Sequence, residues 1–190
     1  MSGPAKFVAS GSQTVGPFFH FGLTTDSTLG TLVRPDTPGE RIRLRVRVLD
    51  GDGAPVPDAM VELYQADAAG QYPEPGARLA GGFTGFGRLP TGADGWCTFE
   101  TIRPGAVPGS PGQPQAPHVN VCLFMRGMLR HVYTRIYFEG DPGLPADPLL
   151  SLVPPERRGT LTASPDPSDP ALWTFAIRLQ GEGETVFFDI

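Results

Sequence analysis

The clearest strand pattern in the sequence is QAPHVNVCLF, residues 115–124. From His118 onward, apolar residues alternate with more polar ones, which predicts a strand with one buried face. Side chains two residues apart share a face and lie about 7 Å apart along a strand, so His118 and Asn120 are predicted to point the same way. A His-x-His pair there could bind a metal ion with two imidazoles, but Asn120 offers only a neutral oxygen that suits hard cations poorly. Two buried, hydrogen-bonded polar residues are therefore the simpler interpretation.

The composition narrows the class of protein. With 190 residues, the chain is long enough for one domain with a single sizeable core. Gly 25 and Pro 22 are abundant, yet the hydrophobic content of 39% argues against disorder, so many turns between short strands are expected. The formal net charge of −5 and the lack of a Lys/Arg cluster argue against nucleic-acid binding. The arginines at 41, 43, 45 and 47 alternate with aliphatic residues, as on the solvated face of a strand.

Turn residues divide the chain into seven predicted strands, at 41–50, 59–66, 96–102, 118–125, 131–138, 173–180 and 185–189. The last two are expected to form a closing hairpin. Residues 79–94 and 103–117 are too rich in glycine and proline for regular structure, and 149–162 is expected to hold a short helical turn. The predicted fold is all-β: a single domain over residues 1–190 with an antiparallel β-sandwich core, long irregular loops and an N-terminal arm.

The N-terminal arm, residues 1–23, ends in the aromatic-rich segment SQTVGPFFHFGL. Gly16-Pro17 predicts a turn within this segment. Three exposed phenylalanines at 18, 19 and 21 would form an apolar patch, so the arm is expected to dock on its own core or on a partner chain.

The cysteines, the first residues of the chain and its apolar runs bear on the cellular compartment of the protein. Cys97 and Cys122 have no paired spacing and both lie in strand-like runs, which predicts buried, inert thiols. The first twelve residues lack an apolar core, so no signal peptide is expected, and no apolar run is long enough for a membrane span. We expect the protein in the cytoplasm.

Several segments together resemble the intradiol ring-cleaving dioxygenases, from about Gln13 to the C-terminus. The matching motifs are SQTVGPFF (12–19), VELYQADAAGQYP (61–73), FGR (86–88), TIRPG (101–105), APHVNV (116–121) and RIYFEGDP (135–142). The resemblance implies a sandwich core of the kind that holds a non-haem ferric ion with two tyrosines and two histidines. Phenolate oxygens suit this hard cation because they supply negative charge.

The resemblance places the four metal-ligand positions at Tyr72, Val107, His118 and Asn120, which we call the relic site. One tyrosine and one histidine are retained, while the other two ligands are replaced by a hydrocarbon and a carboxamide. The resemblance therefore implies that this chain binds no metal. Tyr72 and His118 are expected to be structural residues with hydrogen bonds inside the relic site.

Two neighbours of the relic site also depart from the family pattern. Gln115 replaces an arginine, and Arg135 stands where the iron-bearing chain tends to have a glutamine. We expect the charge of Arg135 to pair with a nearby carboxylate.

Some members of the family combine an iron-bearing β chain with an α chain of the same fold and a degenerate site. The segments at 12–23 and IRLQGEGETVFFDI at 177–190 resemble the α chain. This implies a homologous β chain as the partner, with Fe³⁺ in that partner and no cofactor in this chain. The implied reaction is the cleavage of protocatechuate by O₂ to 3-carboxy-cis,cis-muconate.

The resemblance also implies that this chain lines part of its partner's substrate pocket. The matching positions are Thr14, Gly16 and Pro17 in the arm and Arg126 in the loop after the 118–125 strand. Arg126 suits this role chemically, because protocatechuate carries a carboxylate and a guanidinium is a good partner for one.

Two other interpretations remain open at this point. The chain could be a stand-alone, transthyretin-like β-sandwich binding module that kept the fold and lost the chemistry. It could also be a single-chain catechol dioxygenase with unusual ligands, although Val107 argues strongly against that interpretation.

Overall fold

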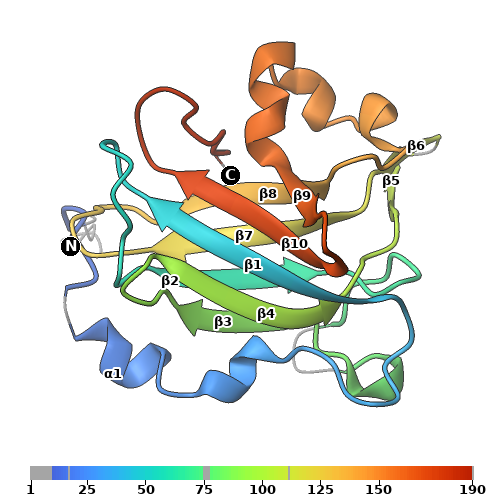
Figure 1. The fold of residues 1–190 in the computed structure, drawn as a ribbon, viewed down its shortest axis with the longest axis horizontal. Helices are drawn as coiled ribbons and strands as arrows, with labels where there is room; N and C mark the ends of the chain where they lie inside the picture. Colours follow the sequence, from blue (N-terminus) through green and yellow to red (C-terminus); the bar gives the residue numbers. More distant parts are fainter. Residues whose placement is uncertain (1–9, 17, 75–77, 111, 190) are drawn as a thin grey trace, which may run out of the picture.

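Eight strands form one sheet that almost closes on itself in the computed structural model, which describes residues 10–16, 18–74, 78–110 and 112–189 (Figure 1). The strand order is β3-β2-β7-β8-β9-β10-β1-β4, and the two edge strands, β3 and β4, contact each other. The bounds are β1 (Arg41–Leu49), β2 (Met60–Gln65), β3 (Phe86–Pro90), β4 (Trp96–Ile102), β7 (His118–Phe124), β8 (Val132–Phe138), β9 (Thr162–Asp166) and β10 (Asp169–Arg178).

The remaining elements are short. A separate two-stranded sheet joins β5 (Val107–Ser110) to β6 (Gln113–Gln115). The helices are α1 (Phe19–Leu23) and the 3₁₀ turns η1 (Ser27–Gly30), η2 (Ala80–Gly82), η3 (Leu144–Ala146), η4 (Leu150–Leu152) and η5 (Pro155–Leu161). No helix in the described part of the chain has the length and apolar character needed to cross a membrane.

The strand alternation predicted from the sequence is confirmed. In β7, Val119, Val121 and Leu123 are buried in the main core, while Asn120 and Cys122 on the other face are half-buried. In β1 the even-numbered aliphatic residues enter the same core. The apolar side chains from both halves of the sheet thus share one interior, and burying them is the main contribution to stability.

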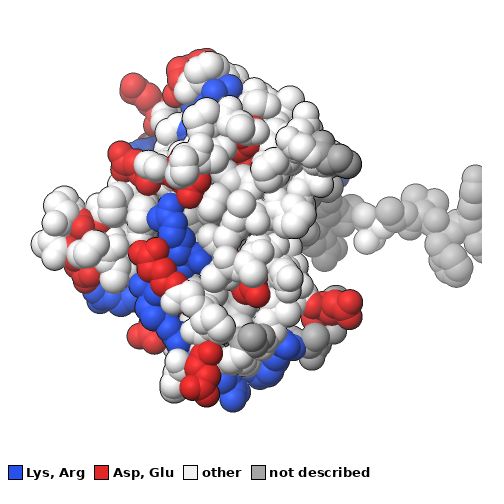
Figure 2. Space-filling model, turned by 90° about the vertical axis from the view of Figure 1, so that its right-hand side faces the viewer, with Lys and Arg blue, Asp and Glu red and all other residues white. Residues whose placement is uncertain are grey.

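The arginines of β1 lie on its outer face, as predicted. Arg43 forms an ion pair with Asp169, and the guanidinium groups of Arg45 and Arg47 lie 4.3 and 5.4 Å from the ring centre of Trp96. Figure 2 shows that on one side of the molecule basic and acidic side chains lie next to each other. These arginines therefore cover a strand face and do not gather into a phosphate-binding patch.

The prediction of a wholly antiparallel sheet is wrong at two pairings. Strands β1 and β10 are parallel, and so are β8 and β9. Parallel neighbours require a long crossover connection, and the chain supplies one between β8 and β9 through η3, η4 and η5. The helical turn predicted at 149–162 is confirmed as η4 and η5.

The structure contains four short strands that the sequence did not predict: β3, β5, β6 and β9. Each contains proline, and β3 and β5 also contain glycine, so their own residues signal turns. Pairing with neighbouring strands decides their conformation, since strand preference depends strongly on context.

The closing hairpin predicted at the C-terminus is wrong. Thr185 contacts Arg178 through a 2.9 Å backbone hydrogen bond, but the chain then leaves β10. Phe188 donates its N–H to the carbonyl of Tyr133 in β8, at 2.8 Å. The tail therefore crosses from one half of the sheet to the other.

The N-terminal arm buries one of its three phenylalanines. Phe19 is buried, whereas 76% of Phe18 and 75% of Phe21 remain exposed, with their rings stacked at 6.0 Å. Of the two expected modes of docking, on the chain's own core or on a partner chain, these two residues do not adopt the first. Residues 1–9 and Pro17 lie outside the described residues.

A glycine allows the loop that carries Tyr72 to approach the β5–β6 hairpin. Gly70 has φ +78°, and a Cβ there would lie 1.9 Å from the carbonyl oxygen of Ala106. Gly140 has a similar φ of +77° with no atom within 4 Å of the corresponding position. A side chain at either position would strain the backbone, but only a side chain at Gly70 would also clash with another atom.

We predict that Gly70→Ala destabilises the protein more than Gly140→Ala. Strain alone costs roughly 1–2 kcal/mol, and the clash at Gly70 adds roughly 1–3 kcal/mol. Denaturant unfolding of both variants measures the difference. Equal losses of stability would show that the loop does not need this close approach.

Candidate functional site

The turn before Tyr72 fixes the position of its ring. Both the Ala69 and the Gln71 N–H groups donate to the Asp67 carboxylate, at 2.9 Å each. The Tyr72 ring stacks on Tyr64 of β2, with ring centres 5.0 Å apart. This directs its hydroxyl group toward the beginning of β7.

Three of the four relic-site residues are joined by hydrogen bonds. The Asn120 amide donates to the Tyr72 hydroxyl at 2.8 Å, and that hydroxyl lies 3.1 Å from Nε2 of His118. Nδ1 of His118 lies 2.8 Å from the carbonyl oxygen of Ala116. Because a carbonyl only accepts, Nδ1 carries the proton, Nε2 accepts, and Tyr72 is the donor. His118 and Asn120 therefore do point to one place, where both are hydrogen-bonded.

Arg135 completes the network from the neighbouring strand β8. Its Nε donates to Oδ1 of Asn120 at 3.0 Å, and Nη1 donates to Oε1 of Gln115 at 2.6 Å. The prediction that Arg135 pairs with a carboxylate is therefore wrong, because two amide oxygens take its hydrogen bonds. Three of the four departures from the family pattern, Gln115, Asn120 and Arg135, thus form one hydrogen-bonded unit.

A buried carboxylate supports the opposite end of the network. Asp147 is fully buried, and its side chain accepts from the backbone N–H of Ala116 at 2.8 Å and from the Tyr137 hydroxyl at 3.0 Å. Since the Ala116 carbonyl in turn accepts from His118, Asp147 fixes the ring of His118 through the backbone of Ala116. The sequence analysis missed this residue, although an Asp that precedes a turn of helix is a typical capping signal.

Val107, the fourth relic position, is buried in β5 next to this network. It pairs with Gln115 across the β5–β6 hairpin, and its backbone lies beside Gly70 in the loop that carries Tyr72. The four positions therefore gather at one end of the sheet, as the resemblance implies.

A ferric ion does not fit these residues. Ligation requires a phenolate and a free imidazole lone pair, but the Tyr72 proton and the His118 Nε2 lone pair bind each other. Burial raises the pKa of Tyr72, which disfavours the phenolate. Asn120 offers its oxygen to Arg135, and Val107 has no donor atom. No group of three or more His, Cys, Asp and Glu side chains suited to a metal occurs among the described residues.

Burial is also the main cause of the low pKa of His118, which falls to about 4, with a smaller contribution from the positive charge of Arg135. The imidazole is therefore neutral at pH 7, which agrees with the proton assignment above.

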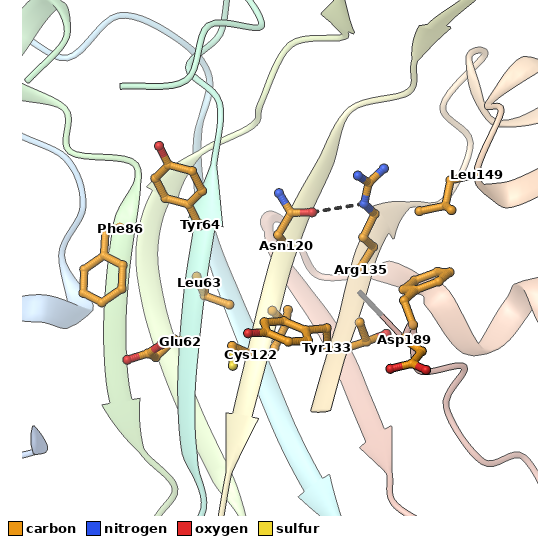
Figure 3. A pocket seen from close by; sticks show the side chains of 13 residues that line it. Glu62, Leu63, Tyr64, Phe86, Asn120, Cys122, Tyr133, Arg135, Leu149 and Asp189 are labelled. Carbon is orange, nitrogen blue, oxygen red and sulfur yellow. Dashed lines mark hydrogen bonds between the residues drawn. The ribbon is translucent and has the colours of Figure 1, made fainter. Parts of the chain in front are cut away.

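A pocket of about 410 Å³ opens on the outer face of β2, β7 and β8, beside Asn120 and Arg135 (Figure 3). Its walls are mostly aromatic and aliphatic. Glu62 on its wall is neutralised by Arg88, with Nε and Oε1 2.7 Å apart. The lining residues are Glu62, Leu63, Tyr64, Phe86, Asn120, Val121, Cys122, Tyr133, Thr134, Arg135, Leu149, Phe188 and Asp189.

Neither thiol offers a reactive group. Burial raises the pKa of Cys122 in the pocket, and that of Cys97 in the core, to about 12. Both side chains are therefore protonated at pH 7. The prediction that both thiols are buried is confirmed for Cys97 and wrong for Cys122, which is half-buried.

The residues predicted to contact substrate lie at the other end of β7. Arg126 is exposed in the loop after this strand and forms an ion pair with Asp58, just before β2. The Gly127 N–H donates to Oγ1 of Thr14 at 3.0 Å, so the arm and this loop meet. Gly16 is in the left-handed conformation, with φ +73°. The third arm position, Pro17, is not described.

This group is well separated from the relic site. Asn120 and Phe124 are four residues apart in β7, so the two ends of the strand are roughly 14 Å from each other. Arg126 lies beyond Phe124, and its side chain cannot reach a molecule bound beside Tyr72.

Comparison with known proteins agrees with this geometry. A family model described as Dioxygenase matches residues 14–181. The protocatechuate 3,4-dioxygenase α chain of Burkholderia cepacia is 44% identical over 193 residues, covering 94% of this chain and 96% of the relative. The chain belongs to the intradiol ring-cleaving dioxygenase family.

Two further relatives resemble this chain at lower identity. The protocatechuate 3,4-dioxygenase β chain of Burkholderia cepacia is 36% identical over 157 residues, covering 80% of this chain and 65% of that relative. The solved dioxygenase domain of a carbohydrate-binding fusion protein from a Streptomyces species is 28% identical, with a TM-score of 0.63, covering 90% of this chain and 97% of that domain. The fold is therefore shared well beyond the α chains.

We predict that stability falls between about pH 6.5 and about pH 4 because of His118. As the pH is lowered through this range, His118 takes up a proton in the unfolded chain but stays neutral in the folded chain. The free energy of unfolding therefore falls by on the order of 3 kcal/mol. Denaturant midpoints measured against pH should show this loss, and His118→Gln should flatten the slope. His131→Gln, at an exposed histidine, is the control. An unchanged slope in His118→Gln would contradict the assignment.

We also predict that restoring the two lost ligands is not sufficient for strong iron binding. Val107→Tyr with Asn120→His should bind ferric iron weakly, because the Arg135 cation remains beside the site. Adding Arg135→Gln should raise the affinity about tenfold or more, since a charge within ~4–6 Å shifts an ionisation by 1–3 pKa units. Titration of the tyrosinate absorption band measures both affinities, with Arg130→Gln in the double variant as the control. Equal affinities with and without Arg135 would contradict this account.

Proposed function

We propose that the chain is the iron-free, α-type subunit of a two-chain intradiol dioxygenase, lending pocket residues to the iron site of a homologous β chain. The complex cleaves protocatechuate with O₂ to 3-carboxy-cis,cis-muconate. The similarity to α chains over nearly the whole length supports this assignment, as does the similarity to a β chain of the same enzyme.

One observation carries the proposal: the separation of the two groups along β7. The relic site is closed by its own hydrogen bonds, while Thr14, Gly16 and Arg126 lie at the opposite end of the strand. Residues so far from the chain's own ligand positions cannot contact a molecule bound there, which supports a role in a site on another molecule. An α–β interface at this end of the sheet supplies such a site.

The arm provides the apolar part of this interface. Phe18 and Phe21 are each about three-quarters exposed, next to the arm segment that contacts the Arg126 loop. Val15 and Leu23 add partly exposed apolar surface on the same arm. We propose that the β chain covers these side chains. A stand-alone binding module would need to bury them itself, so their exposure argues against that alternative.

We further infer that residues 1–190 form a single domain whose nearly closed sheet is flattened into two facing layers, as in a sandwich. Side chains from β1 and β10 and from β2 and β7 share one core, which supports this architecture. Both cysteines are unpaired, which supports a reducing compartment such as the cytoplasm.

Co-expression with the β chain tests the proposal. The chains should purify together and carry one iron per αβ pair, and ring cleavage should require both chains. Two irons per pair, or full activity of this chain alone, would contradict it.

We predict that Arg126→Ala in the complex lowers kcat/KM for protocatechuate by about 10- to 150-fold, because a charge-assisted hydrogen bond is worth roughly 1.5–3 kcal/mol. Catechol, which lacks the carboxylate, should lose little. Arg130→Ala is the matched control, since Arg130 is an exposed arginine in the same loop. Equal losses with the two substrates would assign Arg126 to assembly instead of recognition.

A further inference from the structure

The ion pair between Arg126 and Asp58 joins the proposed substrate residue to a second loop. Asp58 lies in the turn before β2, and Arg126 lies in the loop after β7, so the pair connects the adjacent ends of two antiparallel strands. We propose that Asp58 is a positioning residue, which orients Arg126 so that its guanidinium can bind the substrate's carboxylate. This inference rests on the proposed function.

The atoms used in the pair leave the outer edge of the guanidinium available. Nε of Arg126 donates to Oδ2 of Asp58, and its two Nη groups make no hydrogen bond with any described residue. The Nη groups can therefore form the two parallel bonds of a bidentate carboxylate contact while Nε stays anchored. Asp58 binds Nε, the one guanidinium nitrogen that this bidentate contact does not use.

Asp58 is more buried than Arg126, as expected if Asp58 holds Arg126 in position. The Asp58 side chain is 19% exposed, whereas the Arg126 side chain is 56% exposed. The carboxylate is thus held against the protein, and the long arginine side chain extends from it toward the solvent. An arginine without this anchor would have to be ordered when the substrate binds.

The backbone of the same loop has its own support. The Gly127 N–H donates to the Thr14 hydroxyl, and Gly127 has φ +84°, a conformation that glycine adopts without strain. The hydroxyl keeps its own hydrogen for another acceptor. Thr14 and Asp58 therefore fix the backbone and the side chain of the Arg126 loop from two different segments.

The charge of Asp58 has a second, opposite effect. It cancels the positive charge of Arg126, so its removal also strengthens the attraction for an anion. Salt separates the two effects, because at about 1 M ionic strength the Debye length is only ~3 Å, whereas the loss of orientation persists.

The test uses the αβ complex with protocatechuate and with catechol, at low salt and at about 1 M salt. At high salt Asp58→Asn should raise KM for protocatechuate roughly 3- to 10-fold, the cost of ordering one long side chain, with kcat nearly unchanged. Catechol kinetics should not change. Asp58→Glu, which keeps the charge, should recover part of the loss. Asp169→Asn removes the partner of Arg43 in another exposed pair and should have no effect on KM.

A double-mutant cycle decides whether Asp58 acts through Arg126. In the Arg126→Ala background, Asp58→Asn should add no further loss. A full additional loss, equal effects on the two substrates, or a KM effect absent at high salt would overturn the inference. If Arg126→Ala is selective for protocatechuate and Asp58→Asn is not, only this inference fails. If Arg126→Ala harms both substrates equally, or the complex does not cleave protocatechuate, the proposed role of Arg126 fails as well.

Discussion

The hydrogen bond between the Tyr72 hydroxyl and Nε2 of His118 determines what this site can do. It joins the two retained ligands of the family's iron site, and each occupies the atom through which the other would bind a metal. Asn120 and Arg135 stabilise this arrangement by a donor on one side and a positive charge on the other. The site is thus a complete polar network, and its members need no ion to satisfy them.

The strand β7 keeps this closed network apart from the surface that the chain offers to others. Its first residues carry the network, and the loop after its last residue carries Arg126. The network and the Arg126 loop depend on the same core. The buried face of β7 fixes the direction of the polar side chains that alternate with the buried ones. Replacement of ligand residues at one end therefore leaves the geometry of the other end intact. This explains how a degenerate chain can remain part of an enzyme.

The sequence predicted the features that local patterns encode. The strand pattern located β1, β2, β4, β7, β8 and β10, and the motif positions brought Tyr72, His118 and Asn120 together. The partners of Arg135 and Arg126 could not be predicted, because strand register places Arg135 opposite Asn120 and the loop ends bring Asp58 to Arg126. For the same reason, proline-containing strands such as β9, and the path of Phe188 to Tyr133, depend on distant segments. Tertiary pairing overrides the local signal at each of these positions.

The most direct measurement is the location of iron in the αβ complex with bound protocatechuate. Anomalous diffraction at the iron edge should show one iron per pair, in the β chain, with the Arg126 guanidinium within about 3 Å of the substrate's carboxylate. Tyr72 and His118 should remain hydrogen-bonded to each other, with no iron between them. Iron density between these two side chains, or Arg126 turned away from the substrate, would contradict the account.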